Sequence, residues 1–152
     1  MTRARTKAVV AIDPPSLGPA VGYANGVLAP EGSRILFVAG QVAWDRAHNI
    51  VGGRDLAAQF AQALSNFLEV VRTAGGEPSD VAQMTVFVTD VRAYARARKD
   101  VGAAWRRLLG RHFPAMALVE VQALLEKGAL VEIQGTAALR KKSGRGSTRR
   151  RK

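Results

Sequence analysis

The chain of 152 residues contains no cysteine and only two histidines, His48 and His112. The absence of cysteine excludes disulfides, a thiolate nucleophile and any metal site built on sulfur. A histidine-based metal site would need both histidines together with carboxylates, so we expect no metal centre. No stretch approaches the roughly 20 apolar residues of a membrane span, and the first residues lack the apolar core of a secretory signal. These absences predict a soluble cytoplasmic protein without membrane contact.

The central part of the chain has no excess of positive charge, although the formal net charge of the whole chain is +11. Residues 8–139 hold twelve basic and twelve acidic side chains, so the excess comes from a basic N-terminal extension (1–8) and a Lys/Arg/Gly/Ser tail (140–152). Low-complexity sequence of this kind cannot build a core. We expect a disordered tail that either only solubilises the protein or attracts nucleic acid without sequence preference.

The residues between these extensions, 9–139, show the periodicities of one α+β domain. Apolar residues recurring every three or four positions predict two helices, over 55–74 and 91–109, the first opened by Asp55 and ended by Gly75-Gly76. Short apolar runs bounded by turn residues predict the strands. These predicted strands lie at 9–12, 23–28, 34–38 with an extended continuation over 41–44, 81–88, 117–125 and 130–139.

Several predicted strands are apolar on both faces, and two helices can cover only one face of a sheet. In the strand over 81–88, Met84 and Val86 share one face while Phe87 lies on the other. An exposed apolar sheet face usually marks an oligomer interface. A closed ring of subunits around a shared sheet core is the most economical way to bury it, so we expect a homo-oligomer.

A series of short motifs, each weak alone, follows an order and spacing that together are specific. These motifs are Gly18-Pro19, Phe37-Val38-Ala39-Gly40-Gln41-Val42, Gln59 and Asn66 within the first helix, Ala74-Gly75-Gly76, Thr85-Val86-Phe87-Val88-Thr89-Asp90, Phe113-Pro114-Ala115 and Val131-Glu132-Ile133. Over residues 9–139 the chain thereby resembles the RidA (YjgF) family of reactive-intermediate deaminases.

The resemblance implies a chorismate-mutase-like fold, with a mixed sheet, two helices on one face and assembly as a homotrimer. Small molecules would bind in the clefts between subunits. Family enzymes hydrolyse 2-imino and enamine acids, of the 2-iminobutanoate and 2-iminopropanoate type, to 2-oxo acids and ammonia without a metal or cofactor. In that family an arginine directly after Pro-Ala clamps the substrate carboxylate, and a glutamate in the last strand helps to position the attacking water.

Carried over to this sequence, the resemblance retains only part of that site. Glu132 matches the glutamate and is the candidate catalytic residue, while Gly40 and the backbone of Leu118 are candidate ligand contacts. Met116 stands where the clamping arginine is expected, and Ala20 replaces the tyrosine that typically follows Gly-Pro. The site is therefore expected to bind a different ligand or to bind its ligand differently.

Loss of the arginine changes the chemistry because Met116 offers no hydrogen-bond donor. One charge-assisted hydrogen bond is worth roughly 1.5–3 kcal/mol, so imino acids with a carboxylate should be disfavoured by about ten- to a hundredfold or more. A flexible thioether suits a neutral or hydrophobic ligand instead. The asparagine that the family commonly has in the second helix corresponds to Arg98 or Lys99. Arg98 is a candidate replacement for the clamp; because it lies between Arg96 and Lys99, the alternative is that it faces solvent.

Simpler interpretations of the same residues stay open. Glu132 alternates with apolar neighbours and fits a polar strand face beside Gln134, Met116 fits ordinary packing, and Gly40 fits a bulge. Three functions follow: an imine hydrolase with an altered substrate site, a non-catalytic trimer that binds a small metabolite, and an RNA-binding or ribonuclease role. The last lacks a recognisable pair of acid and base for phosphodiester cleavage.

Overall fold

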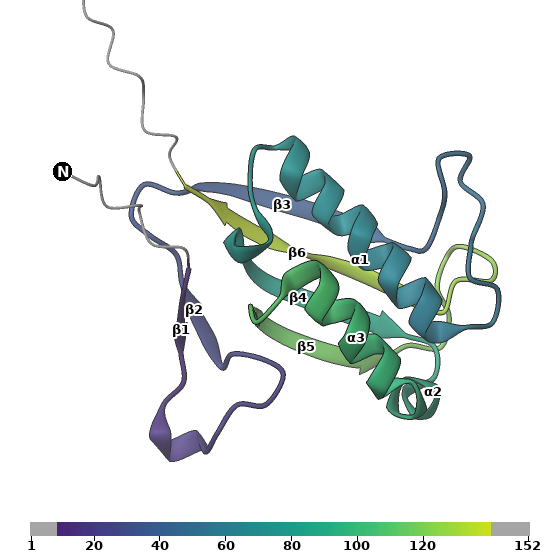
Figure 1. Cartoon of the computed structure of the whole chain (residues 1–152), viewed down its shortest axis with the longest axis horizontal. Helices are drawn as coiled ribbons and strands as arrows, with labels where there is room; N and C mark the ends of the chain where they lie inside the picture. The colour runs from purple at the N-terminus through teal and green to yellow at the C-terminus, as the bar shows by residue number, and fades with distance from the viewer. Residues whose placement is uncertain (1–8, 141–152) are drawn as a thin grey trace, which may run out of the picture.

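The computed structural model describes residues 9–140, so the predicted N-terminal extension (1–8) and, apart from Arg140, the predicted tail (140–152) lie outside the described residues. The elements are β1 (Val10–Ile12), η1 (Pro15–Leu17), β2 (Gly26–Leu28), β3 (Arg34–Gln41), α1 (Leu56–Thr73), η2 (Pro78–Asp80), β4 (Val81–Val88), α2 (Val91–Arg96), α3 (Arg98–Leu109), β5 (Ala115–Glu120) and β6 (Val131–Leu139). In Figure 1, α1 and α3 cover one face of a four-stranded sheet, and β1 with β2 forms a small sheet beside it. The predicted α+β class with helices on one face is confirmed.

The main sheet is mixed and has the strand order β3-β6-β4-β5. Strand β6 is antiparallel to both β3 and β4, whereas β5 runs parallel to β4. A parallel pair requires a crossover connection, and α2 with α3 provides it. Strands β5 and β6 follow each other in sequence yet lie on opposite sides of β4, which separates their side chains.

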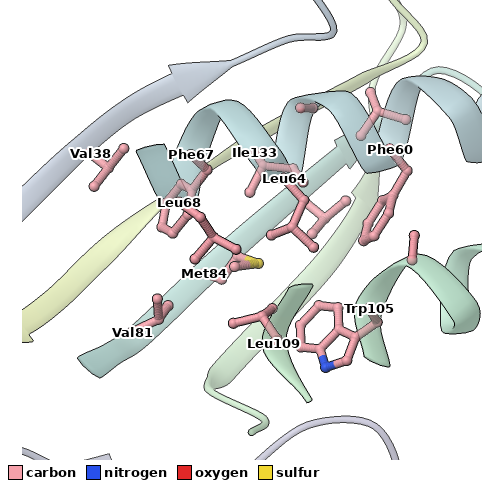
Figure 2. Close-up of a cluster of buried hydrophobic side chains, with 14 of the residues drawn as sticks. Val38, Phe60, Leu64, Phe67, Leu68, Val81, Met84, Trp105, Leu109 and Ile133 are labelled. Atoms are coloured by element: carbon pink, nitrogen blue, oxygen red, sulfur yellow. The ribbon is translucent and has the colours of Figure 1, made fainter. Parts of the chain in front are cut away.

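The hydrophobic core fills the space between the helices and the sheet (Figure 2). Asp55 caps α1 as predicted, because its carboxylate accepts a hydrogen bond of 3.1 Å from the Ala58 backbone N–H. Fully buried side chains from α1 and the strands meet there; the largest are Phe60, Phe67, Leu64, Leu68, Met84 and Ile133. Among the described helices, none is long and apolar enough to cross a membrane.

The predicted second helix over 91–109 is wrong in one respect: it is two helices that meet at Ala97. Ala97 has φ −85° and ψ 0°, outside the α-helical region, and so the helix axis changes direction there. No residue of α2 is buried, whereas α3 buries Val101, Ala104 and Trp105 against the core. After the break, α3 lies on the sheet. The spacing of apolar residues does not distinguish one helix from two here.

The side chain of Gln59, one of the motif residues within α1, holds two loops against the helix. Gln59 is fully buried. Its Nε2 donates to the carbonyl oxygens of Gly53 (2.7 Å) and Gly128 (2.9 Å), and its Oε1 accepts from the Leu130 N–H (2.8 Å). Two loops fold over this side of α1, and the amide of Gln59 satisfies their backbone groups.

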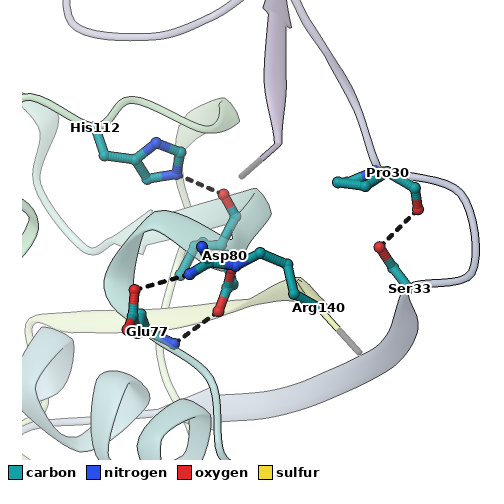
Figure 3. A network of polar contacts seen from close by, with 7 residues as sticks. Pro30, Ser33, Glu77, Asp80, His112 and Arg140 are labelled. Carbon is teal, nitrogen blue, oxygen red and sulfur yellow. Dashed lines mark hydrogen bonds and ion pairs between the residues drawn. The ribbon is translucent and has the colours of Figure 1, made fainter. Parts of the chain in front are cut away.

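Arg140 corrects the predicted boundary of the disordered tail, since it is held by two carboxylates (Figure 3). Its Nε lies 2.8 Å from Oδ1 of Asp80, which is buried, and its second guanidinium nitrogen lies 2.7 Å from Oε2 of Glu77. The folded domain therefore extends through residue 140.

His112 is half-buried, and its Nε2 lies 2.7 Å from the Val81 carbonyl oxygen.

The face of the sheet opposite the helices carries apolar side chains, as predicted. Phe37 is 80% exposed and Ile35 is 51% exposed, while Phe87 is half-buried on the same face. Within residues 9–140 no helix lies over this face (Figure 1). An apolar sheet face of this kind is a typical contact surface for another protein chain.

Candidate functional site

A β-bulge shapes the end of β3. The pairing of β3 with β6 is regular up to Val38 and resumes, shifted, at Gln41. Between them Ala39 and Gly40 oppose a single residue of β6. A bulge bends its strand and redirects the neighbouring side chains, and such features are common beside active sites.

Gly40 lies directly against the carboxylate of Glu132. A Cβ added at Gly40 would overlap the Oε1 of Glu132, so a larger residue here would force the Glu132 side chain to move from this position. The structure thus brings together two of the residues that the sequence predicts for the site. The bulge interpretation of Gly40 is confirmed by the register shift, and its role as a ligand contact stays a prediction.

Glu132 is half-buried on the open face of the sheet, in register with Phe87 of β4. It forms no hydrogen bond or ion pair with any other residue in the described range. Its oxygens can therefore accept hydrogen bonds only from water or a ligand, or from groups beyond this single folded chain. Gln134 is exposed on the same strand face, so the polar-face interpretation describes the surroundings of Glu132 without excluding a chemical role.

Met116 and Leu118 lie on the opposite face, which the helices cover. In β5 they are in register with Met84 and Val86, both fully buried, and they pack at the margin of the core. Met116 is only half-buried there, on the strand at the edge of the sheet, so its role at a ligand site stays a prediction. Strand β4 and the thickness of the sheet separate this pair from Glu132 in the same chain.

Arg98 is exposed at the first position of α3, on the helix side of the sheet. Burial raises the pKa of the neighbouring Tyr94 hydroxyl, and the positive charge of Arg98 acts in the opposite direction, so the two groups are close. The candidate residues thus form two groups in one chain: Gly40 with Glu132 on the open face, and Met116, Leu118 and Arg98 on the helix side.

Asn66 holds the segment that follows the bulge, a role that sequence reasoning missed. Its Nδ2 donates to the carbonyl oxygens of Val42 and Trp44, both at 3.0 Å. Asn66 also borders a groove of about 500 Å³ between α1 and β3, which Gln41 and Glu69 line as well. The sequence signal for this role was an amide side chain among the regularly spaced apolar residues of the helix. Residues 9–140 hold no cluster of three or more potential metal ligands.

Comparison with known proteins extends these observations. Residues 15–139 match the family model described as Endoribonuclease L-PSP. The 2-iminobutanoate/2-iminopropanoate deaminase of Homo sapiens is 28% identical over 124 residues, which cover 82% of each chain. The deaminase of the same name from Bos taurus is 30% identical over 124 residues, again 82% of each chain.

Solved structures agree with the sequence matches. YyfB of Yersinia pestis, a protein of unknown function in the conserved Rid family, has a TM-score of 0.73 at 34% identity, covering 88% of this chain and 100% of that one. The YjgF gene product of E. coli has a TM-score of 0.62 at 30% identity, covering 84% and 94%. With the mixed sheet and the match over residues 15–139, these likenesses establish that the chain belongs to the RidA/YjgF family.

Proposed function

We propose that this protein is an imine or enamine deaminase with an altered substrate site. In the reaction water adds to the carbon of a C=N bond, and the resulting carbinolamine expels ammonia to leave a carbonyl group. The pairing of the bulge Gly40 with the Glu132 carboxylate is the observation that supports this most directly. The deaminase names of the human and bovine relatives point in the same direction.

Glu132 supplies the base for this chemistry. Its carboxylate is partly shielded and is not engaged by other described side chains, so it can accept a proton from the attacking water and return it to the departing nitrogen. Gly40 keeps the space above the bulge open enough for that carboxylate. The reaction needs no electron transfer, and a positioned water with a proton acceptor is sufficient for a reactive imine.

A complete site requires more than one copy of the chain. Glu132 and Met116 lie on opposite faces of the sheet, so a single pocket containing both must use one residue from each of two subunits. The exposed face that carries Phe37 gives a surface for such a contact. We therefore propose a homotrimer with its small-molecule ligand in clefts between subunits.

The ligand differs from a simple imino acid in the group that faces Met116. A thioether cannot pair with a carboxylate, and a carboxylate buried against it would lose its hydration without compensation. The substrate is therefore an imine that presents an uncharged group there, or one whose carboxylate is held by Arg98. Packing of Met116 against Met84 also favours a second candidate, a trimer of the same fold that binds a metabolite without turning it over.

Changing Met116 to arginine separates these two functions. If the parent is a deaminase for uncharged imines, Met116→Arg should raise kcat/KM for 2-iminopropanoate about ten- to a hundredfold, by restoring a charged hydrogen bond. Ammonia release from freshly generated imines at neutral pH is the measurement, with Met116→Leu as the apolar control. If Met116→Arg hydrolyses imines while the parent hydrolyses none, the parent is a binding protein.

Arg98→Ala tests the other candidate for the clamp. An unchanged rate of 2-iminopropanoate hydrolysis in this variant would exclude Arg98 as the clamp.

The assembly can be tested through Phe37. Sedimentation of the parent should give a particle of three chains, and Phe37→Lys should shift it to smaller species, because a charge would replace an apolar side chain in the interface. Leu125→Lys is the matched control, since Leu125 is 96% exposed in a loop outside the sheet. A parent that sediments as one stable chain would leave the shared cleft without a partner and would contradict the proposal.

A further inference from the structure

A cavity of about 280 Å³ lies between the small sheet of β1 and β2 and residues 111–113, which lead into β5. The two walls are joined by a hydrogen bond of 3.0 Å from the Ala24 N–H to the Pro114 carbonyl oxygen. In Figure 1 the small sheet lies beside the main sheet. None of the candidate residues of the deaminase site lines this cavity, so it is a different site.

The wall formed by residues 111–113 is fixed by contacts with its surroundings. The Trp105 Nε1 donates to the His112 carbonyl oxygen at 3.1 Å, and the rings of Trp105 and Phe113 stack with 5.6 Å between their centroids. The Nε2 of the His112 ring lies 2.7 Å from the Val81 carbonyl oxygen and donates to it, because a carbonyl oxygen can only accept. A wall that is already in place lowers the entropic cost of binding a ligand.

The opposite wall carries a carboxylate that is also held in place. Asp13 follows β1, and its Oδ1 accepts hydrogen bonds from the backbone N–H (2.7 Å) and the side-chain Nδ2 (3.0 Å) of Asn25. Its other oxygen, Oδ2, has no partner within residues 9–140 and can accept from a ligand. Ala11 and Val27, which are cross-strand partners in the small sheet, give the same cavity an apolar part.

Arg111 supplies the opposite charge. It lines the cavity, is exposed, and makes no ion pair or hydrogen bond with another residue of the described part of the chain. Arg111 and Asp13 therefore border one cavity without neutralising each other. A guanidinium binds a carboxylate through two parallel hydrogen bonds, and a carboxylate oxygen accepts from an ammonium group. A ligand that carries both groups can pair with both charges.

We propose that this cavity binds a small aliphatic α-amino acid, with its carboxylate on Arg111, its ammonium group on Asp13 and its side chain against Ala11 and Val27. The cavity volume lies just below the range of roughly 300–1,000 Å³ for larger ligands, which suits a molecule of this size. A 2-oxo acid would leave Asp13 unpaired beside a second negative charge, and an amine without a carboxylate would leave Arg111 unpaired. The site therefore selects the zwitterion. This proposal goes beyond the deaminase function and does not depend on it.

Three probes with the same side chain test the ligand chemistry on the full-length protein: L-valine, its 2-oxo acid, and isobutylamine. Amide NMR spectra recorded up to about 10 mM of each probe report affinity and location together, since a ligand this small is expected to bind with a Kd of about 1 mM. L-Valine should bind at least about fivefold more tightly than either analogue. It should also shift the amide signals of Ala11 and Val27.

Two substitutions test the roles of the two charges. Arg111→Gln should weaken L-valine binding at least about fivefold, whereas Arg107→Gln, which removes an exposed charge outside the cavity, should leave it within about twofold. Asp13→Asn keeps an oxygen for Asn25, so the small sheet should stay intact. This variant should bind L-valine more weakly and the 2-oxo acid more tightly than the parent, because it removes both the ammonium partner and the repulsion.

Equal affinity for the three probes, or L-valine binding that is unchanged in both Arg111→Gln and Asp13→Asn, would overturn the proposal. So would the absence of L-valine binding at about 10 mM. Loss of L-valine binding in Glu132→Gln would place the amino acid in the deaminase site instead and would also overturn it. A protein that binds L-valine as expected but hydrolyses no imine would contradict only the deaminase function.

Discussion

Replacing Glu132 with glutamine should lower the rate of imine hydrolysis at least about a hundredfold and leave the fold intact. A carboxamide cannot take the proton of the attacking water, and loss of a general base typically costs 10²- to 10⁴-fold. Stability should not suffer, because glutamine has the same shape above Gly40 and the Glu132 carboxylate has no partner within residues 9–140. The measurements are kcat/KM from ammonia release and the Tm, which should change by less than about 2 °C.

A neighbour on the same strand provides the control for this variant. Gln134 is exposed on the face that carries Glu132, so Gln134→Ala should keep the parent rate within about threefold if only the carboxylate takes part in the chemistry. Equal rates in Glu132→Gln and the parent would remove the catalytic role. Glu132 would then be a half-buried polar residue whose neighbour Gly40 serves only the bulge.

Changing Arg140 to methionine should lower the free energy of unfolding by about 3–5 kcal/mol, which is the usual cost of leaving a buried charge without its partner. Asp80 is 2% exposed and depends on Arg140 for its ion pair. The Glu77 side chain is 58% exposed, so its contact with Arg140 should contribute little. Urea denaturation at neutral pH, with the denaturant slope compared between variants, measures the change.

Two further variants identify the source of that loss. Asp80→Asn combined with Arg140→Met removes the buried charge along with its partner and should recover a large part of the stability. Glu77→Gln alone should cost less than about 1 kcal/mol. If Arg140→Met lowers the free energy of unfolding by less than about 1 kcal/mol, Arg140 does not contribute to the stability of the folded domain.

Local patterns were sufficient to predict much of the fold. The strand over 81–88 has the bounds that the sequence predicts, and the first helix begins after Asp55 and stops before Gly75-Gly76. These elements combine a strong apolar period with cap or turn residues, so the local signal and the tertiary environment agree. The ordered motifs then led to the correct family and to the arrangement of helices on one face.

The remaining differences arise where distant segments meet. Ala97 is a good helix former, so its own sequence does not announce the break at the point where α3 begins. Gln59 has a polar side chain at a position that becomes buried only when two loops fold over α1. Arg140 is indistinguishable from the tail by composition, and the buried Asp80 decides its position.

The candidate site shows the same division between local and global information. Gly40 and Glu132 are 92 positions apart in sequence; the motif resemblance named both as site candidates, and the structure shows that they lie next to each other. The separation of Met116 from Glu132 could not be predicted from either motif. It depends on the strand order, in which β4 lies between β5 and β6.

Strand β6 occupies the interior of the main sheet, although it is synthesised after every other described element. Until it emerges from the ribosome, β3 and β4 have no neighbour between them and expose unpaired backbone groups that can pair with other nascent chains. The domain is therefore expected to complete its sheet only at the end of translation. A chain that stops before residue 131 would keep these strand edges unpaired and is expected to aggregate.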